Sequence, residues 1–353
     1  MKLVSYLNNN SKERVGIFHE GKVYDVKKSG ELFSVKFPSK IKKLLINWEE
    51  HITNIYKLSG EIEQNDLETG INISEVKLLS PVPHPTSCRD GYAFRQHVAA
   101  ARRNRGVEMI PEFDQYPIFY FTNHNAVFGP GDILVEDDHL KSLDFELEAA
   151  IVICKRGKNI PAEKADEYIA GYMVMNDFSA RVLQMEEMKL NLGPAKGKDF
   201  ATSFGPWLVT LDELANYRIS STRGDKYDLE MKAIHNGKIV SQGNMKDMNW
   251  TFAELIERAS YGVELFPGDV IGSGTVGTGC YLELNGTSTL EAKAKGESFT
   301  PVWLRNGDTI ELEITGLGKL INKIVKSSES NSILRKKKNI LNVSLRTKRF
   351  KCS

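Results

Sequence analysis

The sequence predicts a mixed, β-rich fold. Strand-like runs outnumber helical ones, some runs are joined by short Asn-Gly turns, and strands do not alternate regularly with helices, which disfavours a Rossmann or TIM arrangement. The chain has 353 residues, of which 41% are hydrophobic and 26% are charged. This composition is typical of a globular protein with room for one large domain or two smaller ones.

The N-terminal segment predicts a small β-rich module. Residues 2–27 alternate like short antiparallel strands, and residues 40–58 then change to helical spacing. A polar stretch and the Pro-rich residues 79–87 follow and indicate a boundary. We therefore expect a small β-rich N-terminal domain over residues 1–74 and a catalytic domain over residues 75–326.

The rest of the chain is predicted to be mostly strands. Helical spacing covers residues 161–169 and 251–264. The segments IHNGKIV at 234–240 and ELNGTS at 283–288 place Asn-Gly between short runs, which is typical of a two-residue hairpin turn. The expected strands lie at 132–136, 143–155, 171–176, 205–210, 227–243, 270–273, 280–293 and 309–325.

Charge is distributed unevenly along the chain. The net charge is +1, yet residues 335–351 contain eight Lys or Arg and no acid, so residues 1–334 carry a net charge of −7. An acidic body argues against a nucleic-acid partner. We expect residues 327–353 to form a basic, disordered tail.

Cysteine usage and hydropathy bear on the compartment. The cysteines are far apart and form no Cys-x-x-Cys motif, which favours a reducing compartment over a disulfide or zinc framework. No apolar run approaches the ~18 residues that span a bilayer, and the first residues lack the apolar core of a secretory signal. We expect a cytoplasmic protein with no membrane partner.

Alternate positions in LDFELEAAIVIC, residues 143–154, are acidic: Asp144, Glu146 and Glu148. On one strand face their carboxylates would lie about 7 Å apart, near enough for two of them to chelate one hard cation. The apolar continuation predicts burial and hence a need for a counter-charge. TIELEI at 309–314 repeats the spacing, and there a solvent-facing strand is the simpler interpretation.

Two further stretches carry candidate catalytic groups. DGYAFRQH at 90–97 contains an acid, a tyrosine and a histidine, and MNDFSARVLQ at 175–184 ends an apolar strand in an acid that Arg181 and Gln184 follow. Taken singly, the histidine is typical of a surface residue and the acid of a helix N-cap. With the glutamates, these two stretches provide acids, a base and an Arg/Gln pair at predicted strand ends and loops. Active sites commonly lie at such positions.

Two glycine-rich runs supply the remaining candidates. LGPAKGKDFATSFGPW at 192–207 fails as a phosphate loop, because only three residues separate Gly193 from Gly197. We expect Lys198 to act there as a point positive charge. PGDVIGSGTVGTG at 267–279 lets the backbone approach a ligand closely and presents Thr275.

In this order the stretches resemble the fumarylacetoacetate hydrolase family over about residues 75–325, and its fumarylacetoacetase members most closely. The resemblance implies a β-roll core and metal-dependent hydrolysis of a carbon–carbon bond in a 1,3-diketo acid. The specific expectation is cleavage of fumarylacetoacetate to fumarate and acetoacetate in tyrosine catabolism, a branch of aromatic amino acid degradation. One Mg²⁺ or Ca²⁺ per active site and a homodimer are also implied.

The resemblance also implies a role for each site residue. His97 would deprotonate a water that attacks a ketone carbon, and Glu283 would orient its imidazole. Asp144 is not a ligand in this scheme and is expected to be solvated or to support the ligands. The implied metal ligands are Asp90, Glu146, Glu148 and Asp177; the catalytic residues are His97, Glu283, Arg181, Gln184 and Lys198; the substrate contacts are Tyr92, Tyr120, Arg181, Gln184 and Thr275.

One position departs from the family pattern and leaves the substrate open. Met188 lies four residues after Gln184, where fumarylacetoacetase members carry a substrate-contacting tyrosine. Acylpyruvate hydrolysis, oxaloacetate decarboxylation, and hydration or isomerisation of a 2-oxo-alkenoate are alternatives within the superfamily, and a non-catalytic metal-binding scaffold is another. Decarboxylation and isomerisation need no water-activating pair, so His97 with Glu283 favours hydrolysis.

Overall fold

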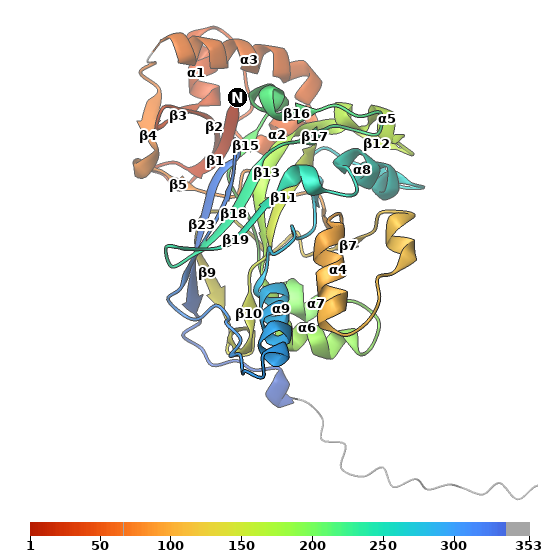
Figure 1. Cartoon of the computed structure of the whole chain (residues 1–353). Helices are drawn as coiled ribbons and strands as arrows, with labels where there is room; N and C mark the ends of the chain where they lie inside the picture. The colour runs from red at the N-terminus through yellow and green to blue at the C-terminus, as the bar shows by residue number, and fades with distance from the viewer. Residues whose placement is uncertain (66, 337–353) are drawn as a thin grey trace, which may run out of the picture.

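The computed structural model describes residues 1–65 and 67–336. Figure 1 shows long strands at the centre of the molecule with helices around them. The strands form a 12-stranded sheet, a five-stranded sheet and three two-stranded pairs within the described residues. The predicted mixed, β-rich fold is therefore confirmed.

The N-terminal residues form an antiparallel hairpin system with helices packed on it, at the top of Figure 1. Strand β1 also pairs with β15, where Lys2 lies opposite Val209, so the first strands extend the sheet of the segment predicted to be the catalytic domain, residues 75–326, which is called the catalytic part below. The elements are β1 (Lys2–Leu7), β2 (Glu13–His19), β3 (Lys22–Asp25), α1 (Val26–Leu32), α2 (Ile41–Ile46), α3 (Trp48–Gln64), β4 (Gly70–Asn72), β5 (Lys77–Leu78) and β15 (Thr202–Val209).

Three strands of the large sheet bring the acidic segments together. Strand β11 (Leu147–Ile153) lies between β13 (Ile169–Asp177) and β21 (Val270–Gly272), and β21 pairs with β6 (Cys88–Gly91). Every residue of β11 and β13 is buried, which explains their near-continuous apolar sequences. The register sets Leu147 opposite Asn176 and Gly272 opposite Asp90, so the acids from three segments meet at one edge.

The five-stranded sheet confirms two sequence interpretations. Asn236 and Gly237 adopt φ angles of 48° and 79° between β18 and β19, as a two-residue hairpin turn requires. In TIELEI the isoleucines and leucine are buried, while Glu311 and Glu313 lie within ion-pair distance of Lys319. The strands are β9 (Gly131–Val135), β18 (Glu230–His235), β19 (Lys238–Asn244), β22 (Thr309–Ile314) and β23 (Gly318–Lys326).

Four helices of the catalytic part, α4, α6, α7 and α9, lie toward the lower end of Figure 1. Helix α8 begins with a capping box, in which Thr251 and Glu254 satisfy each other's backbone N–H groups. The helices are α4 (Arg95–Asn104), α5 (Ala162–Ala165), α6 (Arg181–Met188), α7 (Ala195–Lys198), α8 (Phe252–Ser260) and α9 (Tyr281–Ala294). The short strands are β7 (Phe119–Phe121), β8 (Val127–Phe128), β10 (Leu143–Asp144), β12 (Gly157–Lys158), β14 (Ser179–Ala180), β16 (Arg218–Ile219), β17 (Lys226–Tyr227) and β20 (Glu264–Leu265).

The predicted strand at 280–293 and its hairpin turn are wrong, because this segment is helix α9. The Asp144 carboxylate accepts the first backbone N–H groups of the helix, from Tyr281 at 2.7 Å and Leu282 at 2.9 Å. Gly286 faces α4, where an added Cβ would lie 2.4 Å from Nδ2 of Asn104. The glycine therefore permits close helix packing instead of forming a turn.

The predicted continuous strand at 143–155 is also wrong at one point. Leu143 and Asp144 form β10, which pairs with β14, and β11 begins only at Leu147. The side chains of Asp144, Glu146 and Glu148 are therefore not on one face of a single strand.

The C-terminal segment is described only as far as residue 336. There the Ser332 hydroxyl donates to Asp138 Oδ1 at 2.9 Å, and the Leu334 N–H donates to Asp138 Oδ2 at 3.0 Å. The rest of the expected basic tail, residues 337–353, lies outside the described residues.

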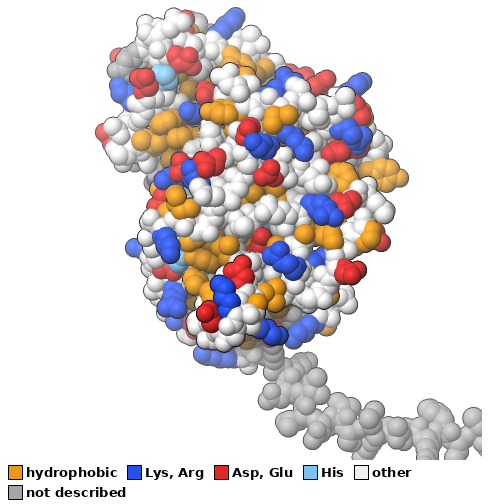
Figure 2. Space-filling view, viewed as in Figure 1, with side chains coloured by type: hydrophobic (Ala, Val, Ile, Leu, Met, Phe, Trp, Pro, Cys, Tyr) orange, Lys and Arg blue, Asp and Glu red, His pale blue; other side chains and the backbone are white. Residues whose placement is uncertain are grey.

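The described surface carries both signs of charge. Figure 2 shows Lys and Arg side chains interspersed with Asp and Glu on the face in view, with hydrophobic side chains between them. A helix with the length and hydropathy to cross a membrane is not found among the described residues.

Candidate active site and metal centre

Three carboxylates from two segments form a buried cluster at the edge of the large sheet. Ligand oxygens of Asp90, Glu146 and Glu148 all lie within 4.8 Å of one another. Asp90, Glu146 and Glu148 are 3%, 6% and 0% exposed, respectively. Glycine makes room for the cluster, since a Cβ at Gly272 would lie 2.5 Å from Asp90 Oδ1, and the N–H of Gly274 donates to that oxygen at 3.1 Å.

A lysine joins this cluster to the fourth predicted ligand. Lys198 Nζ contacts Glu146 Oε2 and lies 2.8 Å from Asp177 Oδ2, and the Tyr120 hydroxyl also contacts Asp177. Burial would raise the pKa of Glu146, but the charges of Lys198 and Arg181 outweigh it and lower that pKa to about 2. Glu146 is thus held ionised by its cationic neighbours.

The guanidinium of Arg181 is held by three side chains of the site. It donates to Asp144 Oδ2 through Nε at 2.8 Å, to Glu146 Oε1 through Nη2 at 2.8 Å and to Gln184 Oε1 through Nη1 at 2.8 Å. Asp144 is completely buried, so the expectation that it could be solvated is wrong. Its guanidinium partner provides the counter-charge that a buried carboxylate needs.

The predicted base and its partner meet across a long sequence separation. His97 on α4 places Nδ1 2.6 Å from Glu283 Oε2 on α9, and both residues are buried. Glu283 is held in turn by the Thr278 N–H, which donates to Oε1 at 3.0 Å. The ring of Tyr92 contacts that of His97 edge-on, with centroids 6.1 Å apart.

The cluster fits a divalent cation. Burial, and then the neighbouring Asp90 and Glu146, raise the pKa of Glu148 well above its ordinary value. Burial and the nearby Asp177 raise the pKa of Asp90 to about 7. Glu148 Oε2 and Asp177 Oδ1 are buried and have no hydrogen-bond partner among the described residues. Crowded carboxylates with unused oxygens are what a hard cation binds.

The family follows from comparison with known proteins. Residues 86–325 match the family model described as fumarylacetoacetate (FAA) hydrolase C-terminal. The chain belongs to the fumarylacetoacetate hydrolase family. The predicted family is thereby confirmed, and the carboxylate cluster and the His97–Glu283 pair lie within the matched segment.

Two similar proteins are named for a specific reaction, the tautomerisation of oxaloacetate. The oxaloacetate tautomerase YisK of Bacillus subtilis is 29% identical over 320 residues, which cover 87% of this chain and 94% of its own. The mitochondrial oxaloacetate tautomerase Fahd2a of Rattus norvegicus is 34% identical over 257 residues, 71% of this chain and 70% of its own. These names do not support fumarylacetoacetase as the specific member.

A solved structure supports the fold. The fumarylacetoacetate hydrolase of psychrophilic Exiguobacterium antarcticum has a TM-score of 0.63 and 23% identity, covering 93% of this chain and 100% of its own. At this identity the likeness concerns the fold alone.

A cavity of about 520 Å³ opens beside the site and is lined by both Tyr120 and Lys198. Its walls also include the apolar side chains of Phe121, Leu190 and Leu192. Lys198 therefore faces a space in which a substrate could bind.

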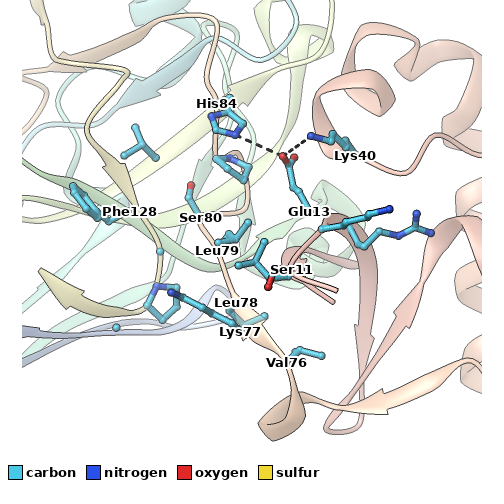
Figure 3. Close-up of a pocket in the computed structure, with 18 of the residues that line it drawn as sticks. Ser11, Glu13, Lys40, Val76, Lys77, Leu78, Leu79, Ser80, His84 and Phe128 are labelled. Atoms are coloured by element: carbon cyan, nitrogen blue, oxygen red, sulfur yellow. Dashed lines mark hydrogen bonds and ion pairs between the residues drawn. The ribbon is translucent and has the colours of Figure 1, made fainter. Parts of the chain in front are cut away.

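A larger cavity of about 1290 Å³ lies between the N-terminal module and the catalytic part, as Figure 3 shows. There Glu13 lies 3.0 Å from the Lys40 ammonium and 3.6 Å from the His84 ring. The described lining of this cavity shares no residue with the carboxylate cluster or the His97–Glu283 pair. Size alone therefore does not locate the active site.

Asn176 is a supporting residue that the sequence did not indicate, whereas support of the ligands was one of the two roles expected of Asp144. The hydroxyl of Thr275, which was expected to contact the substrate, donates to Glu148 Oε1 at 3.2 Å. The sequence suggested no role for Asn176. Its Oδ1 accepts the N–H of Glu146 at 3.1 Å. The carboxylate of Asp144 accepts a hydrogen bond from Arg181. The i, i+2 spacing of Asp144 with Glu146 was the only available signal, and it does not tell a ligand from a supporting acid.

Proposed function

We propose that this chain interconverts the keto and enol forms of oxaloacetate, or of a closely related 2-oxo dicarboxylate, in a metal-dependent active site. The observation that carries the proposal is a buried His97–Glu283 pair in a chain that also gathers the carboxylates of Asp90, Glu146 and Glu148, with His97 near enough to act electrostatically on Glu146. The oxaloacetate tautomerases among its relatives support this substrate over fumarylacetoacetate.

The cation is proposed as one Mg²⁺ or Ca²⁺, held by Asp90, Glu146 and Glu148 with Asp177 as a fourth ligand. When bound, it would withdraw electron density from the 2-oxo group and so acidify the adjacent C3 carbon. Lys198 already neutralises part of the charge of Glu146 and Asp177, which lowers the repulsion between the ligands.

His97 is proposed as the base at C3. The Glu283 carboxylate at Nδ1 favours the tautomer with a proton on that nitrogen, which leaves the lone pair of Nε2 for the substrate. As Nε2 takes the C3 proton, the electron pair of the C–H bond forms the C2–C3 double bond, and the π pair of the 2-oxo group moves to its oxygen. The enolate oxygen then takes a proton from water to give the enol, and the remaining hydroxide is neutralised by the proton of the imidazolium. The imidazolium is stabilised by Glu283, and it returns the proton to C3 in the reverse direction.

The remaining site residues are proposed to bind the substrate. Lys198 lines the 520 Å³ cavity, whereas Arg181 is absent from its described lining, so we assign the contact with a substrate carboxylate to Lys198. Tyr120 lines the same cavity. Tyr92, Gln184 and Thr275 are also absent from the described lining, so the substrate contacts proposed for them rest on the family resemblance alone.

Hydrolysis of a carbon–carbon bond in a diketo acid is the second candidate. The cavity of about 520 Å³, with Leu190 and Leu192 in its wall, falls in the size range of pockets for ligands much larger than oxaloacetate. In this reaction His97 would take a proton from water instead of carbon. The His/Glu pair serves either reaction. Contrary to the expectation from the sequence, its presence therefore does not by itself favour hydrolysis.

One assay separates the two candidates. The purified chain is mixed with enol-oxaloacetate, acetylpyruvate or fumarylacetoacetate, each with Mg²⁺ and with a chelator, and loss of the enol or diketone absorbance is followed. We expect Mg²⁺-dependent ketonisation of oxaloacetate and slower loss of the diketo acids. Cleavage of a diketo acid without any effect on oxaloacetate would replace the first candidate by the second.

The cellular location of the chain and its oligomeric state remain predictions. A cytoplasmic location rests on cysteine usage, while the rat relative is named as mitochondrial. The homodimer rests on the family resemblance. Gel filtration with light scattering would test the homodimer.

A further inference from the structure

We infer that Asp144 is a positioning residue that ties two parts of the active site together: Arg181 on α6, and the His97–Glu283 pair through the first turn of α9. Only the kinetic part of its test rests on the proposed function, whereas the hydrogen-exchange part is independent of it. Asp144 itself belongs neither to the proposed cation cluster nor to the described lining of the cavity.

One buried carboxylate makes every contact in this link. Its Oδ2 accepts from Arg181 Nε at 2.8 Å and lies 2.7 Å from Arg181 Nη2. Its Oδ1 accepts the N–H of Tyr281 at 2.7 Å, and Oδ2 also accepts the N–H of Leu282 at 2.9 Å. Asp144 is 0% exposed, so water does not compete for these donors.

The two amides bound by Asp144 directly precede the residue that orients the base. Tyr281 and Leu282 are the first residues of α9, and Glu283 follows them. The position of this helix start therefore sets where Glu283 meets His97 Nδ1. On the other side, Arg181 extends from Asp144 to the predicted ligand Glu146 at 2.8 Å. Asp144 thus fixes the position of the His97–Glu283 pair relative to the carboxylate cluster.

The chemistry of the link requires a carboxylate. A guanidinium and a helix N-terminus both present positive charge and only donors. Asparagine has the same shape but a single acceptor oxygen, so Asp144→Asn turns an NH₂ group either toward the Tyr281 N–H or toward the donors of both Arg181 and Leu282. The start of α9 therefore loses a buried acceptor in both orientations, and Arg181 loses one in the second, which is costly at a buried position.

A second anchor at the same helix end gives a control. The Tyr281 hydroxyl lies 2.6 Å from His235 Nδ1, and His235 Nε2 lies 3.0 Å from Asp308 Oδ2. Tyr281→Phe removes this anchor but leaves Arg181 bound to Asp144. It therefore loosens the start of α9 without releasing the guanidinium.

The test compares Asp144→Asn with Tyr281→Phe and with Glu313→Gln, which changes a half-buried strand acid paired with Lys319. Steady-state kinetics with Mg²⁺ and oxaloacetate, and hydrogen exchange of the amides of Tyr281 and Leu282, are measured for each. We expect Asp144→Asn to lower kcat roughly 10–100-fold with KM changed less than about threefold, and to speed exchange at these two amides. Tyr281→Phe should speed exchange with a smaller loss of kcat, and Glu313→Gln should match the wild type.

Three results would overturn the inference: a wild-type kcat in Asp144→Asn, unchanged protection of the two amides, or faster exchange throughout the chain, which would indicate a merely structural role. If the wild type turns over neither oxaloacetate nor a diketo acid, the proposed function fails. The exchange pattern then decides the inference alone, with local loss of protection supporting it and unchanged protection refuting it.

Discussion

His97 Nδ1 lies 2.6 Å from Glu283 Oε2, although 186 positions separate the two residues in the sequence. The contact is made between α4 and α9, two helices that pack directly on one another. A buried imidazole held by a carboxylate has a fixed tautomer and a stabilised charged form, as a general base requires.

His97→Ala should remove the base and leave the cation site intact. We expect kcat to fall roughly 10²–10⁴-fold, which is the usual contribution of a positioned base. Isothermal titration calorimetry should give Mg²⁺ affinity equal to that of the wild type, because His97 is not a proposed ligand. Turnover at the wild-type rate would exclude His97 as the base.

Glu148→Gln should have opposite effects with and without metal. In the metal-free chain it removes a buried carboxyl crowded by Asp90 and Glu146, so the thermal midpoint should rise. With saturating Mg²⁺ the midpoint of the wild type should rise above that of the variant, since metal bound only to the folded state stabilises it. An equal Mg²⁺-induced shift in both proteins would show that Glu148 is not a ligand.

The metal-free chain should lose stability as pH rises from about 4 to about 7. The pKa of Asp90 is raised from 3.8 to about 7, so in this range the folded state binds more protons than the unfolded state. The free energy of unfolding, measured by denaturant titration in a chelator, should therefore fall, and Mg²⁺ affinity should increase over the same range. Asp90→Asn should flatten this part of the stability profile, and an unchanged slope in the variant would contradict the assignment.

Gly286→Ala should destabilise the chain even though alanine favours helices. Its Cβ would lie 2.4 Å from Nδ2 of Asn104, which donates to the Glu283 carbonyl at 3.0 Å. We expect a loss of about 1–3 kcal/mol in the free energy of unfolding, the usual cost of overpacking. Gly60→Ala in α3, where an added Cβ meets nothing within 4 Å, should instead gain about 0.5–1 kcal/mol. Equal effects of the two substitutions would contradict the close packing of α4 on α9.

The sequence predicted much of the site because strand periodicity and residue chemistry are local signals. The apolar runs around Glu148 and Asp177 indicated buried strands, and both are buried strands. Helix α9 was missed because its first turn is stabilised by Asp144, 137 positions away, and because Gly286 imitates a turn. The sequence left Asp144 either solvated or supporting the ligands, because its partners Arg181 and the start of α9 come from other segments and no local pattern shows them.

The substrate was the least predictable feature. Each group at the site suits both an enolisation and a hydrolysis, since His97 can take a proton from carbon or from water. The names of the relatives, and not any residue of this chain, favour oxaloacetate. The cavity beside Lys198 depends on Leu190 and Leu192, two exposed side chains that carry no sequence signal.

Exchange of the C3 protons of oxaloacetate in D₂O, followed by NMR with the Mg²⁺-loaded protein, tests the central claim most directly. We predict exchange well above the rate in buffer with the wild type, and exchange at the buffer rate with His97→Ala or with the wild type in a chelator. Exchange by the wild type at the buffer rate, or undiminished exchange by His97→Ala, would contradict the account.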